Sequence, residues 1–234
     1  MKQLGQLATL TIVACLFWQM PAYAAENAYL YFVHGWPGRD VATNADPGFP
    51  VDILLNDESC YLRGFTFGNS NGPLSLPPGQ YDIKISLANT MAPCTNTPLI
   101  ESTVALESNQ DVTAVLALDD SGVPLLSTFP NHFQPVAAGN ARLAIDYAGE
   151  GLAISFVIKA TDSSKTWSYL VKSGTSLVIT LPAGGYTIDA NVGGVTLASE
   201  TVGLPQHSVT ELFAVGNTAN QSLIMVSRTV RDVL

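Results

Sequence analysis

Apolar and polar residues alternate with a period of two along most of the chain after residue 25. In YDIKISL, Tyr81, Ile83, Ile85 and Leu87 fall on one face and the polar residues between them on the other. This is the period of a β-strand with one buried face, and YTIDANV at 186–192 repeats it. The other expected strands are AYLYFVH, VDILL, STVAL, VTAVLAL, ARLAIDY, LAISFVI, SLVITL, VTELFAV and SLIMVSR. The pattern predicts an all-β protein.

The segments between these strands are rich in residues that favour the backbone angles of turns. The clearest examples are SNGP, PPGQ, DDSG and PAGG. Short strands separated by turns of this kind are typical of antiparallel β-sandwiches.

The chain also contains an internal repeat. LPPGQYDIKI from Leu76 matches LPAGGYTIDA from Leu181, DVTAVLAL matches SVTELFAV, and NAYLYFV matches NARLAID, all in the same order. The segment FPNHFQPVAAGN, where Pro, Asn and Gly accumulate, separates the two copies. We therefore predict two tandem antiparallel β-sandwich domains, at 25–130 and 131–234.

The ordered set YLYFVHGWPG, PVDILLN, LSLPPGQYDIKI and DVTAVLAL resembles the DUF4397 family. The resemblance implies an exported bacterial domain of unassigned function that often occurs in tandem, with an Ig-like or transthyretin-like sandwich fold. The second copy diverges, because it has AIDYAGEG in place of FVHGWPG and lacks cysteine. The family supplies no catalytic residues that could be carried over to this chain.

Composition narrows the possible partners. Hydrophobic residues make up 47% of the chain and charged residues 12%, which is ample material for a packed core. The formal net charge is −9, and this charge would repel nucleic acid. We expect no nucleic-acid partner.

Residues 1–24 are predicted to be a signal peptide, with Lys2, an apolar run and the small-residue site AYA before Ala25. A lipoprotein signal at Cys15 is the alternative, but an apolar segment rather than a polar tether follows that cysteine. The apolar run is shorter than the roughly 20 residues that span a bilayer, so we expect no transmembrane segment in the mature chain.

Removal of this segment leaves two cysteines, Cys60 and Cys94, which we predict to form a disulfide within the first domain. Since the second domain has no cysteine, reduction is expected to destabilise the first domain alone. Two cysteines and three scattered histidines show no metal-ligand spacing, so we expect no metal or other cofactor.

Two short motifs resemble parts of an α/β-hydrolase. HGWPG at 34–38 is similar to an oxyanion-hole turn, and GNSNG at 68–72 fits the pattern around a nucleophilic serine. Ser70, Asp189 and His207 even occur in the chain order of a triad. However, three prolines follow Ser70 closely and exclude the helix that this site requires. We predict that both motifs are turns and that the protein is not an enzyme.

The loop after the first strand carries the most varied chemistry. His34, Trp36, Arg39 and Asp40 could form a ligand-binding loop in which Trp36 stacks on a ligand, although a capping role for Trp36 is favoured. Asp46, Asp52, Asp57 and Glu58 could bind calcium, but a solvated acidic loop is the favoured interpretation. Trp167 and Tyr169 alternate along a strand and are expected to face the core.

These observations predict an exported protein of the cell envelope, periplasm or cell surface that acts as a non-catalytic binding or structural module. The sequence does not identify a partner, and envelope polysaccharide and another envelope protein are the two candidates. Surface adhesion or glycan binding is the first alternative, and a secreted serine hydrolase is the second.

Overall fold

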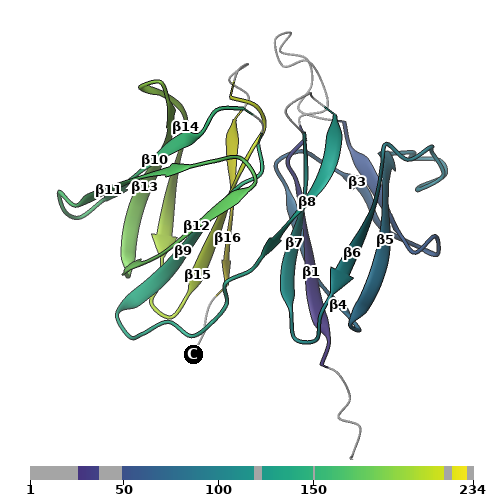
Figure 1. Ribbon diagram of the computed structural model, residues 1–234, viewed down its shortest axis with the longest axis horizontal. Coiled ribbons are helices and arrows are strands. Elements are labelled where there is room, and N and C mark those ends of the chain that lie inside the picture. Colours follow the sequence, from purple (N-terminus) through teal and green to yellow (C-terminus); the bar gives the residue numbers. More distant parts are fainter. Residues whose placement is uncertain (1–25, 37–48, 119–122, 150, 219–222, 231–234) are drawn as a thin grey trace, which may run out of the picture.

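The computed structural model describes residues 26–36, 49–118, 123–149, 151–218 and 223–230. The signal peptide, Cys15, Arg39, Asp40 and Asp46 lie outside this part of the chain. All regular elements within it are strands, and the all-β prediction is confirmed (Figure 1). None of the described elements is a helix that could cross a membrane. The strands are β1 (Ala28–His34), β2 (Val51–Leu55), β3 (Ser59–Phe65), β4 (Ser70–Leu76), β5 (Gly79–Leu87), β6 (Ile100–Leu106), β7 (Asp111–Leu118), β8 (Pro124–Pro130), β9 (Asn140–Tyr147), β10 (Ile154–Ala160), β11 (Thr166–Val171), β12 (Thr175–Pro182), β13 (Gly184–Val192), β14 (Val195–Leu204), β15 (Val209–Val215) and β16 (Ile224–Val230).

The strands form two sandwiches of two four-stranded sheets each. The first unit pairs sheet β4-β1-β7-β8 with sheet β3-β2-β5-β6, and the second pairs β12-β9-β15-β16 with β11-β10-β13-β14. Neighbouring strands are antiparallel except at β1/β7 and β9/β15, which are parallel. Each strand of the second unit has a counterpart eight strands earlier in the chain, at the same place in its sheet.

Each sandwich has its own core of side chains from both of its sheets. In β5, Ile83 and Ile85 are fully buried and Tyr81 packs against this core, as the alternation predicts. Leu87, at the end of the strand, is 36% exposed, so the alternating face leaves the core there.

The repeated LPxGxY motif performs the same task in both units. The Tyr81 hydroxyl donates a hydrogen bond to the Pro77 carbonyl at 2.6 Å, and the Tyr186 hydroxyl donates to Pro182 at 2.8 Å. In each case the tyrosine side chain fastens the turn that enters β5 or β13. This shared contact accounts for the strongest part of the repeat.

One part of the repeat is out of register by a single residue. Tyr29 pairs with Asp111 across β1 and β7, whereas the equivalent Arg142 pairs with Val209 across β9 and β15. Asp111 therefore corresponds to Val209, and not to Ser208 as the matching of DVTAVLAL with SVTELFAV assumes. A shift of one residue exchanges the two faces of a strand. Matched by sequence, residues of β7 that face the core are therefore paired with residues of β15 that face the interface between the units.

The two sandwiches pack face to face through sheets β4-β1-β7-β8 and β12-β9-β15-β16 (Figure 1). Every residue of β15 is buried, as are all but the two end residues of β7. An interface of this kind joins the units into one body of four sheet layers. Its apolar part consists of Val33, Val115, Ala117 and Phe129 from the first unit and Ala148, Phe213, Val215 and Val226 from the second.

The rest of this interface is polar. Arg228 of β16 forms an ion pair with Glu211 of β15, donates to Thr113 Oγ1 of β7 at 3.2 Å and lies 3.7 Å from the centre of the Tyr31 ring. With the Asn131 amide oriented to satisfy both of its polar atoms, its nitrogen donates to Thr113 and Glu211 at 2.8 and 3.1 Å. The charged side chain of the second unit is thus held by groups from both units.

Several strands were missed in the sequence. SNGP, expected to be a turn, lies in edge strand β4, where its proline at position 73 is tolerated because an edge strand has neighbours on one side only. β3, β8 and β14 were also not predicted. These strands have weak or interrupted alternation, and all of them lie at sheet edges.

The predicted disulfide between Cys60 and Cys94 is confirmed. Beside it, the buried Asp52 carboxylate accepts backbone N–H bonds from Gly64 at 2.9 Å, Asn89 at 3.0 Å and Cys94 at 2.9 Å. The disulfide and this carboxylate together fasten the loop between β5 and β6 to β3.

The extensive interface changes the expected response to reduction. Closing a loop between residues 34 positions apart should contribute roughly 3–4 kcal/mol in the chain-entropy model. Because the two units share a buried interface, we now expect Cys60→Ser/Cys94→Ser to shift one common unfolding transition rather than that of the first unit alone. Calorimetry of both proteins measures this, and two separate transitions of which only one moves would contradict it.

Candidate ligand-binding groove

His34 ends β1 inside the protein and not on a binding surface. Its side chain is 0% exposed, its Nε2 donates to the Phe49 carbonyl at 3.1 Å, and its ring lies near those of Phe65 and Phe67. Burial lowers the pKa of His34 to about 4, so the ring is neutral at physiological pH. His34 therefore has the surroundings of a core histidine.

Trp36 is partly buried and packs against the core of the first unit. This position agrees with the capping role that was favoured for it. Arg39 and Asp40 lie outside the described residues, so the proposed loop site as a whole stays a prediction.

The three residues of the formal hydrolase triad belong to different parts of the fold. Ser70 begins edge strand β4 of the first unit, and Asp189 lies in β13 of the second. Asp189 forms an ion pair with Lys159 at 2.7 Å and accepts from Ser199 at 2.7 Å. His207 Nδ1 lies 3.0 Å from the Val136 carbonyl. The strand, turn and helix that hold a nucleophile in α/β-hydrolases are replaced here by an antiparallel edge strand.

We expect Ser70→Ala to leave hydrolysis of an activated ester unchanged, because Asp189 and His207, the other members of the formal triad, lie in the second unit. Wild-type and variant protein are compared with p-nitrophenyl acetate and with a serine-directed fluorophosphonate probe. Stoichiometric labelling that disappears in the variant would show that Ser70 is a nucleophile.

Two of the four acidic residues considered for calcium have structural partners, and Asp46 lies outside the described residues. Asp52 accepts three backbone N–H bonds, and Asp57 pairs with Lys84 at 2.7 Å. Within the described ranges, no group of three or more His, Cys, Asp or Glu side chains could hold a metal ion. Trp167 and Tyr169 share one face of β11 and pack against the core of the second unit, as predicted.

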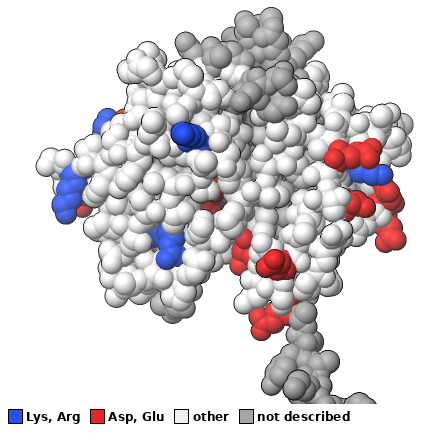
Figure 2. All heavy atoms as spheres, viewed as in Figure 1, with Lys and Arg blue, Asp and Glu red and all other residues white. Residues whose placement is uncertain are grey.

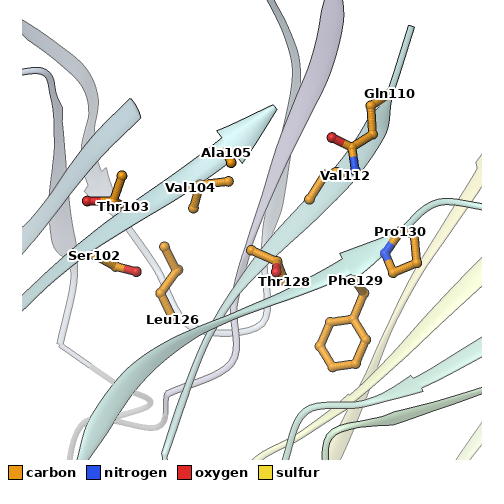
Figure 3. A pocket seen from close by; sticks show the side chains of 10 residues that line it. All are labelled: Ser102, Thr103, Val104, Ala105, Gln110, Val112, Leu126, Thr128, Phe129 and Pro130. Atoms are coloured by element: carbon orange, nitrogen blue, oxygen red, sulfur yellow. The ribbon is translucent and has the colours of Figure 1, made fainter. Parts of the chain in front are cut away.

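A hollow of about 480 Å³ opens at the seam of the first sandwich, between edge strands β6 and β8. Figure 3 shows Ser102, Val104, Leu126 and Thr128 directed into this seam, with the Phe129 ring turned away from them. The remaining lining residues are Thr103, Ala105, Gln110, Val112 and Pro130. Its volume lies within the usual range for ligand sites.

None of the residues that line this seam hollow carries an ionisable side chain. Elsewhere on the first unit, acidic side chains gather at two places on the face seen in Figure 2, whereas most of the basic ones visible there lie on the second unit. The hollow is thus an uncharged region, into which the hydroxyls of Ser102 and Thr128 point beside the apolar side chains of Val104 and Leu126.

The second unit provides an internal comparison for this seam. From the strand pairings, Ser102 corresponds to Glu200, and Thr128 corresponds to Ser227. There the Ser227 hydroxyl donates to Glu200 Oε1 at 3.5 Å and links β16 to β14. The shorter Ser102 makes no such link among the described residues of the first unit.

A second hollow of about 390 Å³ adjoins the first and shares Gln110 and Pro130 with it. It continues toward the connection between the units, past Asp111, Asn131 and Phe133. The two hollows together form a groove. It was missed in the sequence because β8, one of its two walls, was not predicted as a strand.

Comparisons with solved structures give low similarity over most of the chain. The Bacillus anthracis TIE protein is 13% identical with a TM-score of 0.26, over 87% of this chain and 34% of that one, so this chain spans about a third of its length. A Bacteroides ovatus ATCC 8483 protein named as a cell adhesion candidate is 8% identical with a TM-score of 0.29, over 88% of this chain and 97% of that one. CBMbc, a family CBM26 module of Eubacterium rectale Amy13K in complex with maltoheptaose, is 11% identical with a TM-score of 0.29, over 88% of this chain and 96% of that one.

No curated protein matches the chain. A family model does match, over residues 28–145, which include all of the first sandwich and most of β9. Its description is "domain of unknown function (DUF4397)". The chain belongs to the DUF4397 family.

Proposed function

We propose that the protein is an exported, non-catalytic binding module of the cell envelope, and that the groove of its first sandwich is the binding site. Export is supported by the disulfide, since such bonds persist in oxidising compartments outside the cytosol, and by the signal-like segment before Ala25.

The observation that carries this proposal is the uncharged lining of the seam hollow. Catalysis of proton transfer or hydrolysis needs a titratable group or an activated nucleophile, and the residues that line this hollow include no acidic or basic side chain. Thr103 donates to the Asp82 carboxylate at 2.7 Å, but both side chains are exposed and lie on the opposite face of the sheet from Ser102 and Val104. Hydroxyl groups beside apolar side chains suit a neutral ligand, which they can orient by hydrogen bonds while the apolar side chains exclude water.

We further infer that the second unit is a divergent copy of the same domain, with the boundary between β8 and β9. The identical strand order, the parallel central pair and the shared tyrosine contact all support this. In this copy the Ser227–Glu200 contact links the two edges of the seam. We assign the second unit the role of supporting the first through the buried interface.

Ser102→Glu tests the binding site, because it places in the seam of the first unit the residue type that Glu200 provides at the equivalent position of the second unit. The new carboxylate would occupy the hollow and place a charge beside its apolar side chains, so binding of a neutral ligand should weaken at least tenfold. Titration by NMR with neutral oligosaccharides and uncharged peptides measures this. Ser168→Glu, on an exposed position of β11, is the matched control. If no probe binds the wild type, or if both variants bind equally well, the proposed site is wrong.

A further inference from the structure

We propose that the groove binds an extended peptide segment of a partner protein, which adds as a strand to the free edge of β6. This inference rests on the proposed binding function and names the class of its ligand. Three features support it: the free backbone groups at the edge of β6, the alternating side chains that line the seam hollow, and the orientation of Phe129, whose ring turns away from that hollow.

The two walls of the seam are sheet edges. Among the strands that the structure describes, β6 has only β5 as a neighbour in its sheet, and β8 has only β7. Alternate residues of an edge strand direct their N–H and C=O groups away from the sheet, and an incoming strand can bond to them. A peptide paired with β6 would lie in the seam, where the hollow already provides the space.

The sequences of the two edges make β6 the acceptor. β8 begins at Pro124 and ends at Pro130, and a proline cannot donate to an added strand. β6 has the sequence IESTVAL, without proline or lysine, and Glu101 is its only charged residue. Natural edges are commonly protected by such residues, and β6 lacks this protection over its remaining length.

The floor of the hollow has the spacing that a strand requires. Ser102 and Val104 of β6 point inward at successive inward positions, and Leu126 and Val112 lie across from them (Figure 3). Every second side chain of an added peptide would point to this apolar floor, while the side chains between them would face solvent. We therefore expect a ligand with apolar residues at alternate positions.

The hollow favours a peptide over a glycan. Sugar rings stack on exposed aromatic faces, but Phe129, the only aromatic residue among those that line the seam hollow, turns its ring away and packs in the interface between the units. Phe133 in the second hollow packs against Val136 and Val209 and lies edge-on to the Tyr31 ring. The features that remain are free backbone groups and aliphatic side chains, which are the features that recognise an extended peptide.

The test is a selection from a displayed library of random heptapeptides on the wild-type protein, with counter-selection on Ser102→Glu. The enriched peptides should carry apolar residues at alternate positions. They should shift the backbone amide signals of β6 in NMR spectra, and bind Ser102→Glu at least tenfold more weakly than Ser168→Glu.

N-methylated versions of an enriched peptide distinguish strand addition from other binding modes. Only every second amide of an added strand faces β6. Methylation of one alternate set should therefore abolish binding, and methylation of the other set should leave it within about threefold.

Equal tolerance of both methylated sets would overturn strand addition. Binding of neutral oligosaccharides at the same seam, with no enriched peptide, would overturn it as well but leave the proposed binding site intact. If neither peptides nor oligosaccharides bind, both proposals fail.

Discussion

Replacing Arg228 with methionine is expected to lower the free energy of unfolding by about 3–5 kcal/mol, the usual cost of removing one partner of a buried ion pair. Glu211, the partner, is 1% exposed and would lose its cation while keeping the hydrogen bond from the Asn131 amide. The substitution also removes the guanidinium that lies over Tyr31 and the hydrogen bond to Thr113, which together join the second unit to the first.

Urea unfolding followed by tryptophan fluorescence measures this loss. Arg63→Met is the matched control, because Arg63 is exposed on β3 and its replacement should change stability by no more than about 0.5 kcal/mol. The double variant Arg228→Met/Glu211→Leu should recover much of the loss, since it also removes the buried carboxyl group that has lost its cation. A loss below about 1 kcal/mol in Arg228→Met would show that water screens the pair.

Among the described strands, the sequence predicted all those at the centres of the sheets. AYLYFVH, VDILL and VTELFAV coincide with β1, β2 and β15 residue for residue. It failed for β4, where glycine and proline interrupt the alternation, and for β8, which has a proline at each end and no clear alternation between them. Those strands lie at edges, where pairing on one side only tolerates residues that a central strand excludes.

One feature of the sequence indicates that the two sandwiches pack on each other. VTAVLAL is an almost unbroken apolar run, which is typical of a strand buried on both faces rather than one. In VTELFAV the charged residue Glu211 interrupts the apolar run. The interface accommodates Glu211 because Arg228 of β16 forms an ion pair with it. This pairing depends on the fold of the second unit and is not visible in a local pattern.

The candidate site was less predictable than the fold. The motif HGWPG drew attention to His34, but the chain buries this side chain completely. The groove instead depends on the absence of a long side chain at Ser102, and a serine in a strand carries no motif. The role of Ser102 becomes visible only by comparison with the equivalent Glu200, which links the two edge strands of the second unit.

The interface also holds more negative than positive groups, and this should make stability depend on pH. Burial raises the pKa of Glu211 to about 7 even though Arg228 lowers it, and burial raises the pKa of Asp146 to about 6 against a hydrogen bond from Ser176. Burial likewise raises the pKa of Asp111 at the start of β7 and that of Tyr31 on β1. Arg228 is the cation that acts on all four of these groups.

A carboxyl group with a raised pKa keeps its proton in the folded state at pH values where the unfolded chain has released it. The contribution of Asp146 to stability is therefore fully present below about pH 4 and is lost as the pH rises toward 6. His34 and His132 act in the opposite direction, since burial lowers their pKa values. The pH profile of the wild type alone is thus a sum of opposing contributions.

The difference between the wild type and Asp146→Asn isolates the carboxyl group at position 146. Asparagine cannot ionise, and its side-chain oxygen can still accept the hydrogen bond from Ser176. The variant should therefore gain stability relative to the wild type between pH 4 and pH 7, by an amount on the order of 1–3 kcal/mol. Urea unfolding of both proteins at half-unit pH intervals gives this difference directly. A difference that stays constant across the interval would show that Asp146 ionises in the folded protein as it does in the unfolded chain, and that its charge at the interface is solvated after all.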